Sequence, residues 1–437
     1  MSPPSPSERA SLIHTQTPPV AQRTWVKVAG AGGLLLLASG IIYAVAGPAN
    51  DDIATTPIAS TGNGLNATSP NMTTASNTSV SYPSKYAAFY EGMLANMDLT
   101  VNPCDDFYQY ACGGWLKTAT LSDTESFKDT SFYIVDQTNN KVIADIMASH
   151  PDVIDPFYQS CLAEGDVNAD AVADVSVQLN QIADVKSLDA LLTYAGSLYA
   201  TTSTSSFLDL MVYVDPKNSS TNLLMFVQGG LTFPSPEYYA TPRKYLPLLQ
   251  EYVASLSHIE AFRGVNATTL LALETQFANA SVNIMQVFSD PFKSYHKLSL
   301  NDVQANYPHV ASYLRGVQPS LFNRSSVQTL VPTPDFFAAQ EAILQATDLR
   351  VLKAYLSFHL VHARTSVLGD SFRLATHKFE AVLQGLPAVE SRETFCLDQV
   401  KSLLGEYLGQ LYMDKAFDHS AKTQARQLIG QIEAAMV

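Results

Sequence analysis

The sequence predicts a mainly helical protein with a small β-hairpin, preceded by one transmembrane helix. Apolar residues recur at helical spacing in three long segments, 170–199, 335–364 and 400–412. Two β-rich runs flank a short polar turn, and an uncharged run near the N-terminus is long enough to span a bilayer. With 437 residues, 46% of them hydrophobic, the chain can also bury a large core.

The uncharged run comprises residues 28–47, and we expect it to be a signal-anchor helix. Arg23 and Lys27 precede the run and acidic residues follow it, so the positive-inside rule makes residues 1–27 a cytoplasmic tail. The protein would then be single-pass type II, in the plasma membrane or a secretory-pathway membrane, with an extracellular or lumenal ectodomain. A cleaved signal peptide is the alternative, because residues 44–46 read Ala-Val-Ala.

Small residues within this run have a spacing that brings two spanning helices together. The pairs are Ala29 with Gly33 and Gly40 with Ala44, which makes a homodimer possible. The net charge of −14 argues against a nucleic-acid partner, which would require a basic patch.

Residues 48–84 are rich in Thr, Ser, Asn and Pro, and we expect them to form a flexible, glycosylated stalk. Asn-x-Ser/Thr sequences are acceptors for N-linked glycans, and a cluster of them after a membrane span favours an exported ectodomain. The candidate asparagines are Asn66, Asn71, Asn77, Asn218, Asn266, Asn279 and Asn323.

Residues 85–437 read as the folded part of the chain. The runs 207–216 and 222–230 predict a hairpin joined by the polar turn Lys-Asn-Ser-Ser-Thr. Residues 420–437 predict a helix with Ser420 as its N-cap, and this helical pattern is unfinished where the sequence stops.

Thirteen residues, Pro103 to Trp115 (PCDDFYQYACGGW), form the most informative motif. Two cysteines, Cys104 and Cys112, frame an acidic and aromatic helical turn. Asp105 and Asp106 suit the positive end of a helix, and the two glycines suit its termination. On composition alone this is a surface helix that carries a disulfide.

The same string closely resembles the opening motif of the neprilysin-like (M13) zinc metallopeptidases. Three further segments resemble that family in the same order along the chain: Asp155 to Cys161, Gln228 to Tyr239, and Glu393 to Phe417. The resemblance extends from about Tyr86 to the last residue. It implies that residues 85–437 are the large helical N-terminal lobe of that fold, which caps a central cavity that admits short peptides.

The family hydrolyses peptide bonds with zinc held by His-Glu-x-x-His and a later Glu, and this string is absent from the sequence. His359 and His362 come closest, but they are three residues apart with no Glu between them. The other histidines considered, His296, His309, His377 and His419, have no partner at ligand spacing. We therefore assign no catalytic and no metal-binding residue to this chain, and expect zinc only in the full-length family enzyme.

Four cysteines, Cys104, Cys112, Cys161 and Cys396, allow three pairings. The resemblance implies a Cys161–Cys396 disulfide and leaves Cys104 and Cys112 without their usual partners, which lie in the C-terminal half of the family enzymes. A local bridge between Cys104 and Cys112 is the alternative.

One residue is a candidate for contact with substrate. In the family, a basic residue after the opening motif can bind the C-terminal carboxylate of the peptide, and Lys128 occupies the position where arginine is usual. Because lysine offers one point charge instead of a bidentate fork, carboxylate recognition would be looser. A solvated surface lysine is the alternative.

The sequence therefore predicts the N-terminal part of a membrane-anchored zinc metalloendopeptidase that cleaves short peptides outside the cell, inactive on its own. The catalytic half would have to be supplied for peptide substrates to be cut. Two alternatives remain: a non-catalytic binding or decoy module, and one half of a split peptidase.

Overall fold

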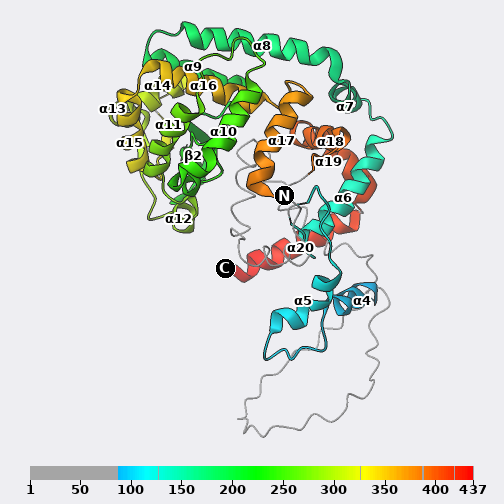
Figure 1. Cartoon of the computed structure of the whole chain (residues 1–437). Coiled ribbons are helices and arrows are strands. Elements are labelled where there is room, and N and C mark those ends of the chain that lie inside the picture. Colours follow the sequence, from blue (N-terminus) through cyan, green and yellow to red (C-terminus); the bar gives the residue numbers. More distant parts are fainter. Residues whose placement is uncertain (1–86, 126, 325, 386–387, 418, 437) are drawn as a thin grey trace. The chain divides into compact units, whose positions relative to one another are not determined.

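The computed structural model describes residues 87–125, 127–324, 326–385, 388–417 and 419–436. The chain divides into two compact units (Figure 1). We call Val153–Leu403 the large unit, and the described residues of Leu35–Asp152 and Leu404–Val437 the small unit. The predicted tail 1–27, anchor 28–47 and stalk 48–84 lie outside the described residues. None of the described helices combines the length and the hydropathy needed to cross a membrane.

The large unit is mainly helical, as predicted. Its α-helices are α7 (Asp155–Leu162), α8 (Glu164–Asp184), α9 (Leu188–Thr202), α10 (Pro242–Leu256), α11 (Ala267–Ala280), α12 (Ile284–Ser289), α13 (Leu300–Asn306), α14 (Pro308–Val317), α15 (Pro334–Ala346), α16 (Leu349–Arg364), α17 (Asp370–Gln384) and α18 (Arg392–Leu403). Two short 3-10 helices, η2 (Pro236–Ala240) and η3 (Pro319–Asn323), complete them.

The predicted hairpin is present, as β1 (Leu208–Asp215) and β2 (Asn218–Gln228), which pair antiparallel. Its turn is tighter than expected, since most of the polar segment belongs to β2 and the register shifts between Val214 and Asp215. Two short strands, β3 (Lys297–Ser299) and β4 (Gln328–Leu330), extend the sheet in the order β1-β2-β4-β3, with β2 and β4 parallel. The sheet is therefore mixed.

Each long helical segment of the sequence analysis is interrupted in the structure. Segment 170–199 divides between α8 and α9, where the Ser187 side chain caps α9 by accepting from the Ala190 N–H. Segment 335–364 divides between α15 and α16, where Asp348 caps α16. Side-chain caps of this kind offer the backbone an alternative to a continuing helix. The third segment, 400–412, breaks at Leu404, the first residue after the large unit.

Aromatic and aliphatic side chains from most of these helices form one core in the large unit. The closest helix pair is α9 with α14, which Figure 1 shows side by side. Glycines permit this approach. A Cβ atom on Gly196 would lie 2.0 Å from the Tyr313 carbonyl oxygen, and one on Gly316 would lie 1.8 Å from that of Thr193.

The small unit contains α4 (Ala87–Asn96), α5 (Phe107–Thr118), α6 (Phe132–Met147), α19 (Gly405–Ala416) and α20 (His419–Met436). Helices α4 and α5 pack together, as do α6 and α19, where the Tyr412 hydroxyl donates to Asn139 Oδ1 at 2.8 Å. The predicted N-cap at Ser420 is wrong, because α20 already includes His419.

Candidate functional site

The opening motif forms α5, and Asp106 caps it by accepting a hydrogen bond from the Gln109 N–H at 2.9 Å. The expectation that Gly113 and Gly114 end this helix is wrong, since α5 continues to Thr118. The glycines instead make room for a neighbouring segment. A Cβ atom on Gly114 would lie 2.4 Å from the Ala95 carbonyl oxygen, so only glycine lets α5 lie directly on the end of α4.

A buried carboxylate also stabilises the packing of α5 against the end of α4. Asp98 is 7% exposed, and it accepts hydrogen bonds from Lys117 Nζ at 2.7 Å and from the hydroxyl and N–H of Thr100. These donors hold the pKa of the Asp98 carboxyl well below its usual range, with the hydrogen bond from Lys117 the largest cause. Asp98 therefore remains ionised and ties the segment after α4 to the last turn of α5.

The small unit also exposes many large apolar side chains, which we call its exposed apolar set. Phe107, in the opening motif itself, is 69% exposed. The set comprises Phe89, Met93, Leu94, Leu99, Phe107, Tyr108, Leu116, Leu121, Phe127, Phe132, Ile134, Tyr407, Met413, Ile429, Ile432 and Met436. Exposed apolar residues in such number are typical of a surface that another polypeptide covers.

The two cysteines of the opening motif are free thiols in the structure, Cys104 exposed and Cys112 partly buried. They do not form the local bridge considered as an alternative. Both therefore lie in the unit that carries the exposed apolar set.

Lys128 lies on the surface of the small unit. Its ammonium group donates to the Thr120 carbonyl oxygen at 3.2 Å and lies 5.7 Å from the centroid of the Tyr133 ring. These contacts hold the side chain against its own loop. They leave the predicted contact with a substrate carboxylate untested, and it stays a prediction.

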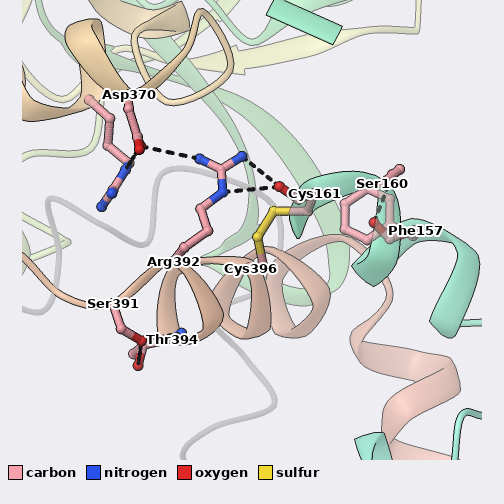
Figure 2. The surroundings of a disulfide bond; sticks show 9 residues. Phe157, Ser160, Cys161, Asp370, Ser391, Arg392, Thr394 and Cys396 are labelled. Carbon is pink, nitrogen blue, oxygen red and sulfur yellow. Dashed lines mark hydrogen bonds and ion pairs between the residues drawn. A yellow bond between two sulfur atoms is a disulfide. The ribbon is translucent and has the colours of Figure 1, made fainter. Parts of the chain in front are cut away.

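The large unit contains the disulfide that the resemblance implied, between Cys161 on α7 and Cys396 on α18 (Figure 2). The bonded cysteines are 235 residues apart in the sequence, and Cys396 is fully buried. Because α7 begins and α18 ends the large unit, the bond joins its two ends.

An arginine next to this disulfide adds hydrogen bonds and an ion pair to the covalent link between α7 and α18. The Arg392 guanidinium donates twice to the Cys161 carbonyl oxygen, through Nε at 3.0 Å and Nη2 at 2.6 Å. Its Nη1 lies 3.7 Å from a carboxylate oxygen of Asp370 at the start of α17 (Figure 2). One side chain therefore links α7, α17 and α18, and sequence reasoning did not identify it.

On α16, His359 is buried and His362 is half-buried, and they have different partners. His359 Nε2 lies 3.4 Å from Glu274, whereas His362 Nδ1 lies 2.7 Å from the Tyr252 hydroxyl. Burial, and then the proximity of His359, lowers the pKa of His362 to about 4, so its ring is neutral at physiological pH. The two histidines thus have separate partners: His359 lies at ion-pair distance from Glu274, and His362 is hydrogen-bonded to Tyr252.

Glu274 is the most deeply buried carboxylate of the helical core, with no exposed surface. It accepts hydrogen bonds from the Thr232 N–H at 2.9 Å, from the Thr232 hydroxyl and from the Tyr239 hydroxyl. Thr232 and Tyr239 belong to the family-like segment Gln228 to Tyr239, so this segment is held by a carboxylate on α11. In the sequence, the signal that could have identified Glu274 as a buried, hydrogen-bonded carboxylate is its place as a lone acidic residue on the apolar face of a helix.

No group of three His, Cys, Asp or Glu side chains within the described ranges is placed to hold a metal ion. His309 is paired instead with Glu341, 2.5 Å from its Nδ1, and this carboxylate also accepts from the His309 N–H. The residues that the structure describes therefore do not fit the zinc site of the family.

Four of the candidate glycosylation asparagines are described, and all four are exposed: Asn218, Asn266, Asn279 and Asn323. Asn66, Asn71 and Asn77 lie outside the described residues. Exposure is compatible with a glycan at each of the four positions, and their modification stays a prediction.

Comparison with known proteins identifies the family. The sequence model of the protein family described as peptidase family M13 matches residues 103–437. The chain therefore belongs to this family. It is 26% identical over 386 residues to mouse membrane metallo-endopeptidase-like 1, covering 79% of this chain and 50% of that protein. It is 25% identical over 369 residues to bovine endothelin-converting enzyme 1, covering 78% of this chain and 48% of that protein.

Solved structures show the same fold. The zinc metalloprotease Zmp1 of Mycobacterium tuberculosis, in complex with an inhibitor, superposes with a TM-score of 0.68 at 20% identity, over 78% of this chain and 54% of that one. PepO of Lactobacillus rhamnosis gives a TM-score of 0.60 at 16% identity, over 76% and 55% of the two chains. The chain thus spans about half the length of the relatives it matches.

Proposed function

We propose that this chain is the N-terminal part of a membrane-anchored zinc metalloendopeptidase that cleaves short peptides outside the cell. In this proposal the chain alone is inactive, and a C-terminal half supplies the zinc ligands and the general base. The exposed apolar set of the small unit is the observation that carries the proposal. Zinc and peptide substrates then belong to the assembled enzyme.

The distribution of apolar side chains supports this assignment. The first half of an enzyme would expose the apolar surface that its second half covers, and the small unit exposes many large apolar side chains. The exposed apolar set includes Phe107 and Tyr108, which lie in the opening motif of the family. Cys104 and Cys112 lie in the same motif, and in this proposal they pair with cysteines of the C-terminal half.

The membrane placement rests on the uncharged run 28–47 and the positive charges before it. One relative carries the word membrane in its name. A single-pass type II topology then puts the exposed asparagines of the ectodomain in the compartment where N-linked glycans are attached. In the assembled enzyme, Lys128 would receive the C-terminal carboxylate of the peptide.

The decisive measurement compares the chain alone with the chain joined to an M13 catalytic half. Residues 85–437 should bind no stoichiometric zinc and cleave no fluorogenic peptide, and the joined protein should do both, with loss of activity on chelation. Stoichiometric zinc and chelator-sensitive cleavage by residues 85–437 alone would overturn the proposal. The nucleotide sequence after the codon for Val437 gives an independent check, because it should encode His-Glu-x-x-His and two more cysteines.

A non-catalytic binding module is a second candidate, and the closed core of the large unit favours it. That unit carries its own disulfide and encloses most of its large apolar side chains. This hypothesis requires a stable secreted form of the ectodomain, so misfolding of residues 85–437 on expression would count against it.

A split peptidase is tested by mixing the two halves as separate chains and assaying for zinc-dependent cleavage.

A further inference from the structure

A groove of about 980 Å³ lies on the large unit, and the family assignment gives it no role. It is bounded by the second half of α8, the first half of α16 and the loop that leads into α11. Its apolar floor includes Ala261, Val265 and Val351, which are half-buried, and the buried residues Leu179, Ile182 and Leu270 lie beneath them. The groove has the size and the mixed lining of a ligand site.

The rim of the groove is polar, and its charges are nearly balanced. Arg350 is paired with Asp348 at 3.0 Å, and Arg263 is paired with Glu260. Lys353 reaches from α16 to α8, where its ammonium donates to the Ala183 carbonyl oxygen at 2.7 Å. Because each arginine already has a carboxylate partner, the rim does not select for a charged ligand. Hydrogen-bonding groups above an apolar floor suit a neutral molecule with many hydroxyls and some C–H surface, such as an oligosaccharide.

One glycan acceptor lies on the edge of this groove. Asn266 is exposed and lines the groove, and it begins the sequence Asn-Ala-Thr. Its Oδ1 caps α11 by accepting from the N–H groups of Thr268 at 2.9 Å and Thr269 at 3.1 Å. The carbonyl oxygen therefore faces the helix and Nδ2 faces away from it. N-linked glycosylation replaces one N–H hydrogen of Nδ2 and leaves Oδ1 in place, so the helix cap is retained.

We propose that an N-linked glycan on Asn266 lies in this groove, covers its apolar floor and holds α8 against α16. Asn218, Asn279 and Asn323 are also exposed, but they are not among the residues that line the groove. The glycan on Asn266 is thus distinguished from the others by its surroundings. This inference rests on the proposed extracellular or lumenal placement of the ectodomain.

The test uses the full chain expressed in a eukaryotic secretory cell, with glycopeptide mass spectrometry and hydrogen exchange as readouts. Thr268→Ala removes the acceptor sequence and keeps Asn266 as the helix cap, and Thr268→Ser keeps both. Ser220→Ala removes the acceptor sequence at Asn218 and is the matched control, since Asn218 also accepts a hydrogen bond from the backbone N–H two residues later.

We expect Asn266 to be glycosylated in the wild-type protein. We also expect Thr268→Ala to speed exchange of residues 176–183 and 348–357 by about threefold or more, because local opening is easier once the glycan is absent. Thr268→Ser and Ser220→Ala should leave these peptides unchanged. Equal exchange with and without the Asn266 glycan overturns the inference, as does glycosylation of the other acceptors with Asn266 unmodified. No glycan at any acceptor contradicts the lumenal placement, and the inference with it.

Discussion

The large unit contains nearly all of the buried apolar side chains of the described chain, whereas the small unit buries few and exposes many. In the small unit, the buried apolar residues among those described are Ile146, Met147, Leu408 and Ala421. The exposed apolar set of the same unit is larger, and its most exposed member, Met436, is 81% exposed. The difference indicates that the large unit holds its fold by its own packing, while the small unit has the composition of an interface.

The two units also differ in how their chain segments are joined. The large unit is one continuous stretch closed by a disulfide, while the small unit combines α4 to α6 with α19 and α20 from the other end of the chain. Changes in the large unit should therefore act on its folding. Changes in the exposed apolar set should act mainly on association.

Removal of the disulfide should have the largest effect. Cys396→Ala opens a loop between residues separated by 235 positions, which costs about 5 to 6 kcal/mol in the chain-entropy model. Denaturant unfolding followed by hydrogen exchange should show this loss in the large unit, with α4 and α5 unchanged. Equal stability of the variant and the wild-type protein would contradict a structural role for the bond.

Acid should weaken the large unit through His362. Burial keeps the folded-state pKa at about 4, below the unfolded value of 6.5, so the unfolded chain binds the proton first. The stabilisation is present above pH 6.5 and is lost as the pH falls from 6.5 to 4, by about 3 kcal/mol in total. In His362→Gln, the free energy of unfolding should fall less over this range.

His309 acts in the opposite sense, because the hydrogen bond with Glu341 raises the pKa of His309. The stabilisation from this pair is lost as the pH rises through the raised pKa of His309.

A methyl group between α9 and α14 should have the next largest effect. Gly316→Ala places a Cβ atom 1.8 Å from the Thr193 carbonyl oxygen, and the required backbone shift should cost about 1 to 3 kcal/mol. Gly409→Ala in the small unit is the matched control, since nothing lies within 4 Å of its Cβ position on α19. Thermal unfolding should separate the two variants, and a Gly316→Ala protein as stable as the control would show that the helices can move apart freely.

The smallest effect on stability is expected from the exposed apolar set. Phe107→Ser should change the free energy of unfolding by less than about 0.5 kcal/mol, because a surface substitution loses little packing. The same change should reduce binding of a hydrophobic dye and weaken association with an M13 catalytic half. A clear loss of stability without either effect would identify Phe107 as part of the fold of the small unit.

Local patterns in the sequence determined the elements that depend on neighbouring residues. Helical periodicity predicted the mainly helical class, and the two β-rich runs predicted the hairpin, because alternation and turn residues act within a few positions. Family resemblance added the Cys161–Cys396 pair, which no local pattern could select. The resemblance also identified the family, which the match over residues 103–437 confirms.

Contacts between distant segments decided the rest. Gly113 and Gly114 resemble a helix end in sequence, and the structure uses them for close packing because the end of α4 lies against them. Glu274 is one acidic residue in an apolar helix until Thr232 and Tyr239 surround it. The groove beside Asn266 exists only where α8, α11 and α16 meet. Burial and close packing depend on which distant residues the fold brings together. The spacing of residues along one segment carries no information about those distant partners.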